Sequence, residues 1–160
     1  TLTLPDPLIR EIGARIMGLD EPTAKMSKST HALRPSHGIA LSDPPDVIRR
    51  NIMRATTDSG SETRFDHAAP GVHNLLTIYE TLSHEPRPTI EARFAGQGYG
   101  TLKRAVADLV LATLAPIQDR FAPLVTESSY LDDVLREGAE RVRPTAEATL
   151  RRAMEALGLR

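Results

Sequence analysis

Apolar residues recur at intervals of three and four positions through most of the chain after residue 44, and this spacing constrains the fold more than any other feature. Such spacing gives a helix one side that packs against a core and one polar side. The clearest run comprises Val72, Leu75, Leu76, Tyr79 and Leu82. Residues 44–158 are therefore predicted to form an all-helical bundle.

Prolines and capping residues set the expected start of this bundle. A first helix is predicted over residues 44–55, because Ser42 or Asp43 can cap it and Pro44 suits a first helical position. A second is expected near 70–83, after Pro70.

Two more helices are expected before residue 122. A short one ends near Ala95, and a long one runs from Leu102 to Phe121. Pro116 lies inside the long helix and is expected to bend it without ending it, because proline removes one backbone hydrogen bond.

Two closing helices are expected at the end of the chain, one from about Ser129 and one after Pro144. Their apolar residues are expected to face inward. These residues are Leu131, Val134, Leu135, Val142, Ala146, Leu150, Ala153, Met154 and Leu157.

The first 43 residues follow a different pattern. Proline and glycine interrupt them too often for a long helix, so they are predicted to be mostly irregular. The run Ile16–Leu19 is the one candidate for a strand or an extended segment. We therefore expect residues 1–43 to be the edge of another domain and residues 44–160 to be a helical domain.

The composition excludes several classes of protein. Lys and Arg total 20 against 21 Asp and Glu, so any contact with nucleic acid must come from a local patch. The chain has no cysteine, which excludes a disulfide scaffold and a sulfur-ligated metal. It shows neither an apolar run long enough to span a membrane nor a secretory signal, so no membrane contact and a cytoplasmic location are expected. Because the first residue is Thr1, a processed or partial polypeptide is expected.

The segment Lys25-Met26-Ser27-Lys28-Ser29 carries the clearest chemical signal. Two ammonium groups and nearby hydroxyls can converge on one anion, and phosphate is the obvious target. Of the 20 basic residues only three are lysines, and two of those stand in this segment. A lysine is a flexible point charge, unlike the planar fork of arginine, so the choice has physical meaning.

These five residues match KMSKS, the second signature of the class I aminoacyl-tRNA synthetases. Further segments resemble the bacterial tryptophanyl-tRNA synthetase family in order along nearly the whole chain, and tyrosyl-tRNA synthetases are the nearest alternative. The matching segments are Gly13–Leu19, Glu21–Thr23, Arg54–Ser59, Gly71–Val72, Asn74–Leu76, Tyr99–Lys103 and Val106–Asp108.

The resemblance implies the C-terminal half of such an enzyme. Residues 1–43 would be the end of a Rossmann-type nucleotide-binding domain with the KMSKS loop, and residues 44–160 the helical anticodon-binding domain. The implied reaction is activation of tryptophan by ATP, with release of pyrophosphate, followed by transfer to tRNA(Trp). A homodimer is also implied.

The resemblance also implies roles for individual residues. Lys25 and Lys28 would be catalytic, stabilising charge that develops on the phosphates together with Mg²⁺. Ser27 and Ser29 would support the loop, and the ATP site would comprise Ile16 and residues 25–29. Ile16 has a second reading, in which its side chain simply packs in the core.

The sequence departs from the family in one important respect. Class I enzymes carry a His-x-Gly-His signature, and the only His-Gly pair here, His37-Gly38, follows the KMSKS segment and lacks the second histidine. The chain alone is therefore not expected to catalyse the reaction. A stand-alone helical module that binds tRNA without adenylation remains the alternative.

Other patterns have simpler explanations. The five histidines form no i, i+4 pair and are expected on the surface or in loops, with no metal site in the chain. No Gly-x-Ser-x-Gly elbow marks a hydrolase nucleophile. Seven arginines could meet tRNA phosphates or simply form a charged helix surface, namely Arg49, Arg50, Arg54, Arg141, Arg143, Arg151 and Arg152.

Overall fold

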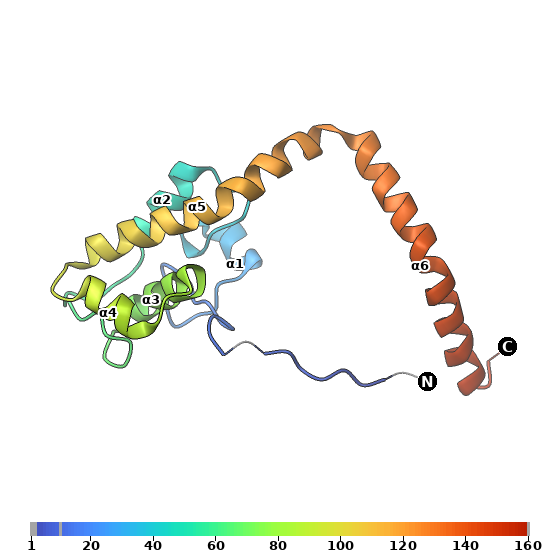
Figure 1. Ribbon diagram of the computed structural model, residues 1–160, viewed down its shortest axis with the longest axis horizontal. Helices are drawn as coiled ribbons and strands as arrows, with labels where there is room; N and C mark the ends of the chain where they lie inside the picture. Colours follow the sequence, from blue (N-terminus) through green and yellow to red (C-terminus); the bar gives the residue numbers. More distant parts are fainter. Residues whose placement is uncertain (1–2, 10, 160) are drawn as a thin grey trace. The chain divides into compact units, whose positions relative to one another are not determined.

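A computed structural model describes residues 3–9 and 11–159. Over these ranges the chain forms helices and no β-strand, apart from one isolated bridge between Met17 and Lys25. The expectation of a mainly helical fold is confirmed. The helices are α1 (Lys28–Leu33), α2 (Pro45–Met53), α3 (Pro70–Ser83), α4 (Arg87–Phe94), α5 (Tyr99–Thr126) and α6 (Ser128–Ala156), with a 3₁₀ turn, η1 (Pro35–His37), between α1 and α2 (Figure 1).

The chain divides into two compact units, and the division falls inside α5. One unit is Ile9–Gln118, which we call the core unit. The other combines Thr1–Leu8 with Asp119–Arg160. The core unit holds the KMSKS segment together with α1 to α4, so the candidate site can be described within it.

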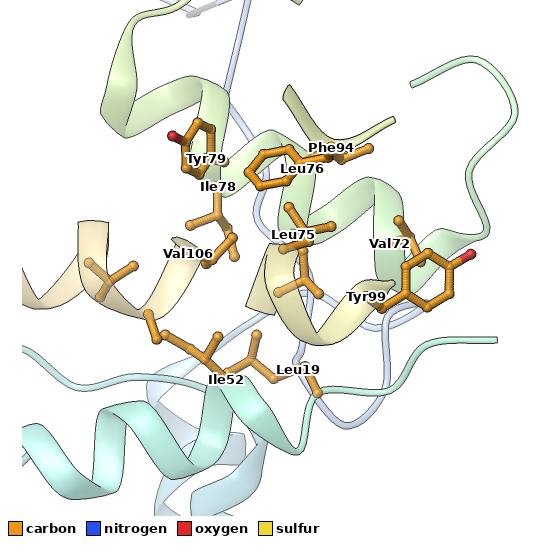
Figure 2. Packing of buried hydrophobic residues seen from close by; sticks show 14 of the residues in the cluster. Leu19, Ile52, Val72, Leu75, Leu76, Ile78, Tyr79, Phe94, Tyr99 and Val106 are labelled. Carbon is orange, nitrogen blue, oxygen red and sulfur yellow. The ribbon is translucent and has the colours of Figure 1, made fainter. Parts of the chain in front are cut away.

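A single hydrophobic cluster holds the core unit together (Figure 2). Its fully buried members come from α2 (Ile48, Ile52), α3 (Val72, Leu75, Leu76), α4 (Ile90) and α5 (Leu102, Val106). Leu19, from the segment before α1, is buried with them, so the irregular first part of the chain is anchored in the same core. Burying side chains of this size is the main source of folding free energy in such a unit.

Helix α3 matches the predicted range 70–83, because its apolar pattern is continuous and Pro70 fixes its start. Helix α2 begins one residue later than predicted, at Pro45, with Pro44 at the N-cap and no side-chain cap. Asp43 instead accepts a hydrogen bond from the backbone N–H of Ala40 at 2.8 Å. The predicted cap is therefore wrong, because the carboxylate is used by the turn before the helix.

The two long helices tolerate their internal prolines. Helix α5 continues through Pro116, as predicted, and α6 continues through Pro144, where two separate helices were expected. A proline inside a helix leaves the carbonyl four residues earlier without its N–H partner. Glu140, four residues before Pro144, is exposed, so water can reach this part of the helix and hydrate that carbonyl.

The apolar residues expected to face inward from α6 are mostly exposed in this chain. Leu135 keeps 71% of its side-chain exposure and Leu157 75%, and Leu131, Val134, Val142 and Leu150 are also exposed. Periodicity predicts which side of a helix is apolar but not what covers it, and this explains the error. The buried helical residues of the core unit come from α2 to α5. Among the described helices, none is long and apolar enough to cross a membrane.

Candidate functional site

The segment before the KMSKS residues forms a tight reversal of the chain. Met17 and Lys25 pair as an antiparallel bridge. On either side of this bridge, the Gly18 N–H donates to the Ala24 carbonyl at 2.8 Å, and the Met26 N–H donates to the Ile16 carbonyl at 3.0 Å. The main chain of the first two KMSKS residues is therefore fixed by backbone pairing.

The second half of the motif begins a helix. Ser27 is the N-cap of α1, and its Oγ accepts a hydrogen bond from the Thr30 N–H at 3.2 Å. The same hydroxyl donates to Thr30 Oγ1 at 2.7 Å and lies 3.4 Å from Ser29 Oγ. Serine is among the best N-cap residues, so the local structure follows from the sequence here. The expectation of a mostly irregular segment missed α1 because the helix has only six residues.

Helix α3 holds Met17, in the part of the reversal that comes first in the chain. The Asn74 side chain accepts a hydrogen bond from the Met17 N–H at 2.9 Å and donates one to the Met17 carbonyl at 2.8 Å. Asn74 is buried, so both the oxygen and the nitrogen of its side-chain amide need protein partners. A buried asparagine in a hydrophobic helix therefore ties the core directly to the residue that pairs with Lys25.

His37 lies behind the loop and is completely buried. Its Nδ1 is 2.7 Å from Asp20 Oδ1, and its Nε2 is 3.1 Å from the Lys25 carbonyl oxygen. The prediction was a surface or loop position; His37 lies in the turn η1 and is buried, so the surface alternative is wrong. Spacing in the sequence could not reveal it, because its partners come from 17 and 12 residues away.

The side chains that would meet a ligand are accessible. Lys25, Lys28 and Ser29 are exposed, whereas Met26 and Ile16 are half-buried and pack against the core cluster. For Ile16, the side chain thus packs in the core while its carbonyl pairs with Met26. A hollow of about 430 Å³ lies beside the loop, lined by Met26, Ser27, Lys28, His31, Ala32, Gly38, Ile39 and Ala40.

A second set of contacts links the loop to the end of α2. The Thr56 N–H donates to the Leu19 carbonyl at 2.7 Å, and Thr56 Oγ1 donates to the Asp20 carbonyl at 2.9 Å. Lys103 of α5 donates to the Ala55 carbonyl at 2.7 Å, and burial lowers the pKa of this lysine. The third lysine of the chain is therefore bonded within the core unit, whereas Lys25 and Lys28 are exposed.

Asp20 is the acidic group of this site. Partial burial raises its pKa, but hydrogen bonds from His37 and Ser36 and the positive charge of Arg34 outweigh that effect, so the pKa lies below its usual value. Asp20 is therefore an anion at neutral pH. In the described part of the chain, no group of three or more His, Asp or Glu side chains is arranged to hold a metal ion.

The predicted arginines differ in their surroundings. Arg49 forms an ion pair with Asp108 at 2.7 Å, and Arg50 lies 3.8 Å from Asp46. Arg141, Arg143, Arg151 and Arg152 are exposed on α6. The charged-surface reading fits Arg49 and Arg50 directly, and no arginine is assigned to tRNA.

Comparison with protein families gives a match to the model described as "tRNA synthetases class I (W and Y)" over residues 1–115. Two similar curated proteins are named tryptophan–tRNA ligase. The one from Wolinella succinogenes is 48% identical over 99% of this chain and 48% of its own length. The one from Bacillus subtilis is 43% identical over 98% of this chain and 47% of its own length.

Solved structures that resemble this chain are also tryptophanyl-tRNA synthetases. A tryptophanyl-tRNA synthetase from Mycoplasma pneumoniae matches with a TM-score of 0.80 at 33% identity, over 94% of this chain and 45% of the other. The enzyme from Campylobacter jejuni, solved with ADP and tryptophan, matches with a TM-score of 0.68 at 25% identity, over 98% and 47%. The chain thus spans about half the length of the relatives that it matches.

Proposed function

Because the chain belongs to the class I tRNA synthetases of the tryptophan and tyrosine family, we propose that the protein that carries it is a tryptophan–tRNA ligase. The observation that carries this proposal is the 48% identity to a protein of that name across 99% of the chain, which includes the KMSKS loop. The relatives described above are all named for tryptophan, which favours tryptophan over tyrosine.

The proposed reaction has two steps. The carboxylate of tryptophan attacks the α-phosphorus of ATP, and the bond to the β-phosphate oxygen breaks, so that tryptophanyl-adenylate and pyrophosphate form. A terminal hydroxyl of tRNA(Trp) then displaces AMP from the adenylate. In the first step negative charge grows on the departing pyrophosphate, and fixed positive groups lower the barrier by stabilising it.

Lys25 and Lys28 are the groups proposed to supply that charge. Their main chain is held by the bridge to Met17 and by the Ser27 cap, while their ammonium groups are exposed. A fixed backbone with accessible side chains suits contact with phosphates. Ser27, Ser29, Met26 and the main chain of Ile16 complete the proposed ATP-binding set.

The remaining expectations complete the proposal. Residues 1–43 form the end of a Rossmann-type domain, residues 44–160 contact the tRNA anticodon, and the protein acts as a cytoplasmic homodimer. Mg²⁺ accompanies ATP, where it neutralises phosphate charge. The described residues offer no carboxylate cluster for the ion, and Mg²⁺ in such sites is commonly carried by the substrate's phosphates.

Charging of tRNA tests the proposal. The protein that carries this chain should attach labelled tryptophan to tRNA(Trp) in the presence of ATP and Mg²⁺. Binding of tRNA without charging would instead favour the non-catalytic helical module. Charging of tRNA(Tyr) with tyrosine would move the protein to the other branch of the family.

A further inference from the structure

The contacts of His37 define its role more closely than its burial does. A carbonyl oxygen only accepts hydrogen bonds, and an ionised carboxylate also only accepts them. His37 faces one of each, the Lys25 carbonyl at Nε2 and Asp20 at Nδ1. Each ring nitrogen therefore faces an acceptor, the Asp20 carboxylate on one side and the Lys25 main chain on the other.

The surroundings of His37 leave little room for the ring and also hold the main chain on both sides of it in sequence. A Cβ atom added to Gly18 would lie 2.2 Å from His37 Cε1, so the glycine is needed for the ring to fit. The Asn51 side chain donates to the carbonyls of Pro35 and Gly38, at 2.7 and 3.2 Å, on either side of the histidine. The His37 carbonyl accepts from the Leu19 N–H at 2.9 Å. These bonds hold the main chain that carries the imidazole.

We propose that His37 is a positioning residue for the KMSKS loop, in which its imidazole fixes the main chain of Lys25 and Asp20 orients the imidazole. This inference rests on the proposed function, because it concerns how the loop acts on ATP. Lys25 is both the residue whose carbonyl is bound and the first lysine of the motif. Displacement of a catalytic group by about 1 Å can cost roughly 10²-fold in rate, so a tether at this carbonyl can affect catalysis without touching substrate.

The test compares His37→Ala with Ser36→Ala in the protein that carries this chain. Ser36 Oγ donates to the other oxygen of Asp20 at 3.1 Å, so Ser36→Ala disturbs the same carboxylate without affecting the bond to Lys25. In tryptophan-dependent ATP–pyrophosphate exchange, kcat for His37→Ala should fall about 10- to 100-fold. For Ser36→Ala, kcat should stay within about twofold of the original protein, which is far less than the effect of displacing a catalytic group.

A double-mutant cycle separates positioning from a general loss of structure. In a Lys25→Ala background, His37→Ala should lower kcat much less than it does in the original protein, because the ammonium group that it places is gone. An equal loss in both backgrounds would overturn the proposal. His37→Gln, which can still donate one hydrogen bond to the Lys25 carbonyl, should recover part of the rate, and it replaces His37→Ala in the cycle if the alanine variant does not fold.

Amide hydrogen exchange decides the case independently of catalysis. The Met26 amide, which is bonded to the Ile16 carbonyl, should exchange faster in the His37 variant than in Ser36→Ala, while amides in α3 stay protected. Equal exchange in both variants would overturn the tether. If the original protein shows no exchange of pyrophosphate with tryptophan, the proposed function fails, and faster amide exchange would then support the tether as a structural feature alone.

Discussion

At the scale of single residues, the two lysines of the loop combine a fixed backbone with free side chains. Backbone pairing holds Lys25, and the Ser27 cap holds the turn that begins with Lys28. Neither ammonium group is buried. Substitution of either lysine should therefore affect the reaction far more than the stability of the fold.

Lys28→Ala should lower the rate of tryptophanyl-adenylate formation by roughly 10² to 10³, because losing one preorganised donor costs about 2.7 to 4 kcal/mol. Single-turnover kinetics with excess enzyme measure this step directly. The midpoint of urea unfolding should not change. Lys28→Arg is the matched control for charge, and it should remain impaired because a planar guanidinium does not reproduce a point charge. An unchanged rate in Lys28→Ala would contradict the assigned role.

Asp20 should make stability depend on pH in the acid range. Burial raises its pKa, but the hydrogen bonds from His37 and Ser36 and the charge of Arg34 outweigh that effect, so the pKa lies below its ordinary value of 3.8. The stabilisation is present above that ordinary value and is lost as the pH falls through the folded-state pKa. Urea unfolding between pH 6 and pH 3 should therefore show a smaller acid loss for Asp20→Asn than for the original protein. Equal losses would show that the carboxylate does not carry this effect.

At the scale of elements, the close approach of α3 to the segment after α2 depends on one glycine. A Cβ atom on Gly71 would lie 1.9 Å from the Thr56 carbonyl oxygen, which is backbone and cannot turn aside. Gly71→Ala should therefore destabilise the core unit by about 3 kcal/mol or more. Urea unfolding followed by circular dichroism measures the loss.

Gly100 provides the matched control for this substitution. It stands in the first turn of α5, and the nearest atom to an added Cβ is the flexible end of Arg104, at 3.5 Å. Gly100→Ala should change stability by no more than about 1 kcal/mol, the difference in helix propensity. Similar effects of the two substitutions would contradict the packing argument.

The sequence predicted these elements to different degrees. Helix α3 followed from its pattern, because nearly every turn is buried and Pro70 marks the start. Helix α1 did not, since six residues are too few for periodicity, although Ser27 is a capping signal. The sequence pattern predicted two helices separated at Pro144, but α6 is continuous there. The prediction was wrong because an internal proline is tolerated more easily where the helix is exposed to water.

The candidate site shows the same limit. The lysines and serines of the KMSKS loop could be recognised as a motif, whereas His37, Asp20 and Asn74 act through contacts between residues distant in sequence. Asn74 lies in a segment that resembles the family, but nothing in the sequence predicted its hydrogen bonds to the main chain of Met17. Contacts of this kind depend on the fold, so a sequence alone does not predict them.

At the scale of the whole molecule, the chain corresponds to about half the length of each relative. The chain aligns over nearly its full length with about half of each relative, and it contains the KMSKS loop but no His-x-Gly-His signature. The core unit positions the loop through α3, η1 and the end of α2.

Amino-acid-dependent ATP–pyrophosphate exchange tests this account most directly. The protein that carries the chain should be assayed with tryptophan and with tyrosine side by side, with the Lys28→Ala variant as the control for the loop. We expect exchange with tryptophan, none with tyrosine, and a loss of roughly 10² to 10³ in the variant. Absence of exchange with tryptophan, or exchange that the variant retains in full, would contradict the account.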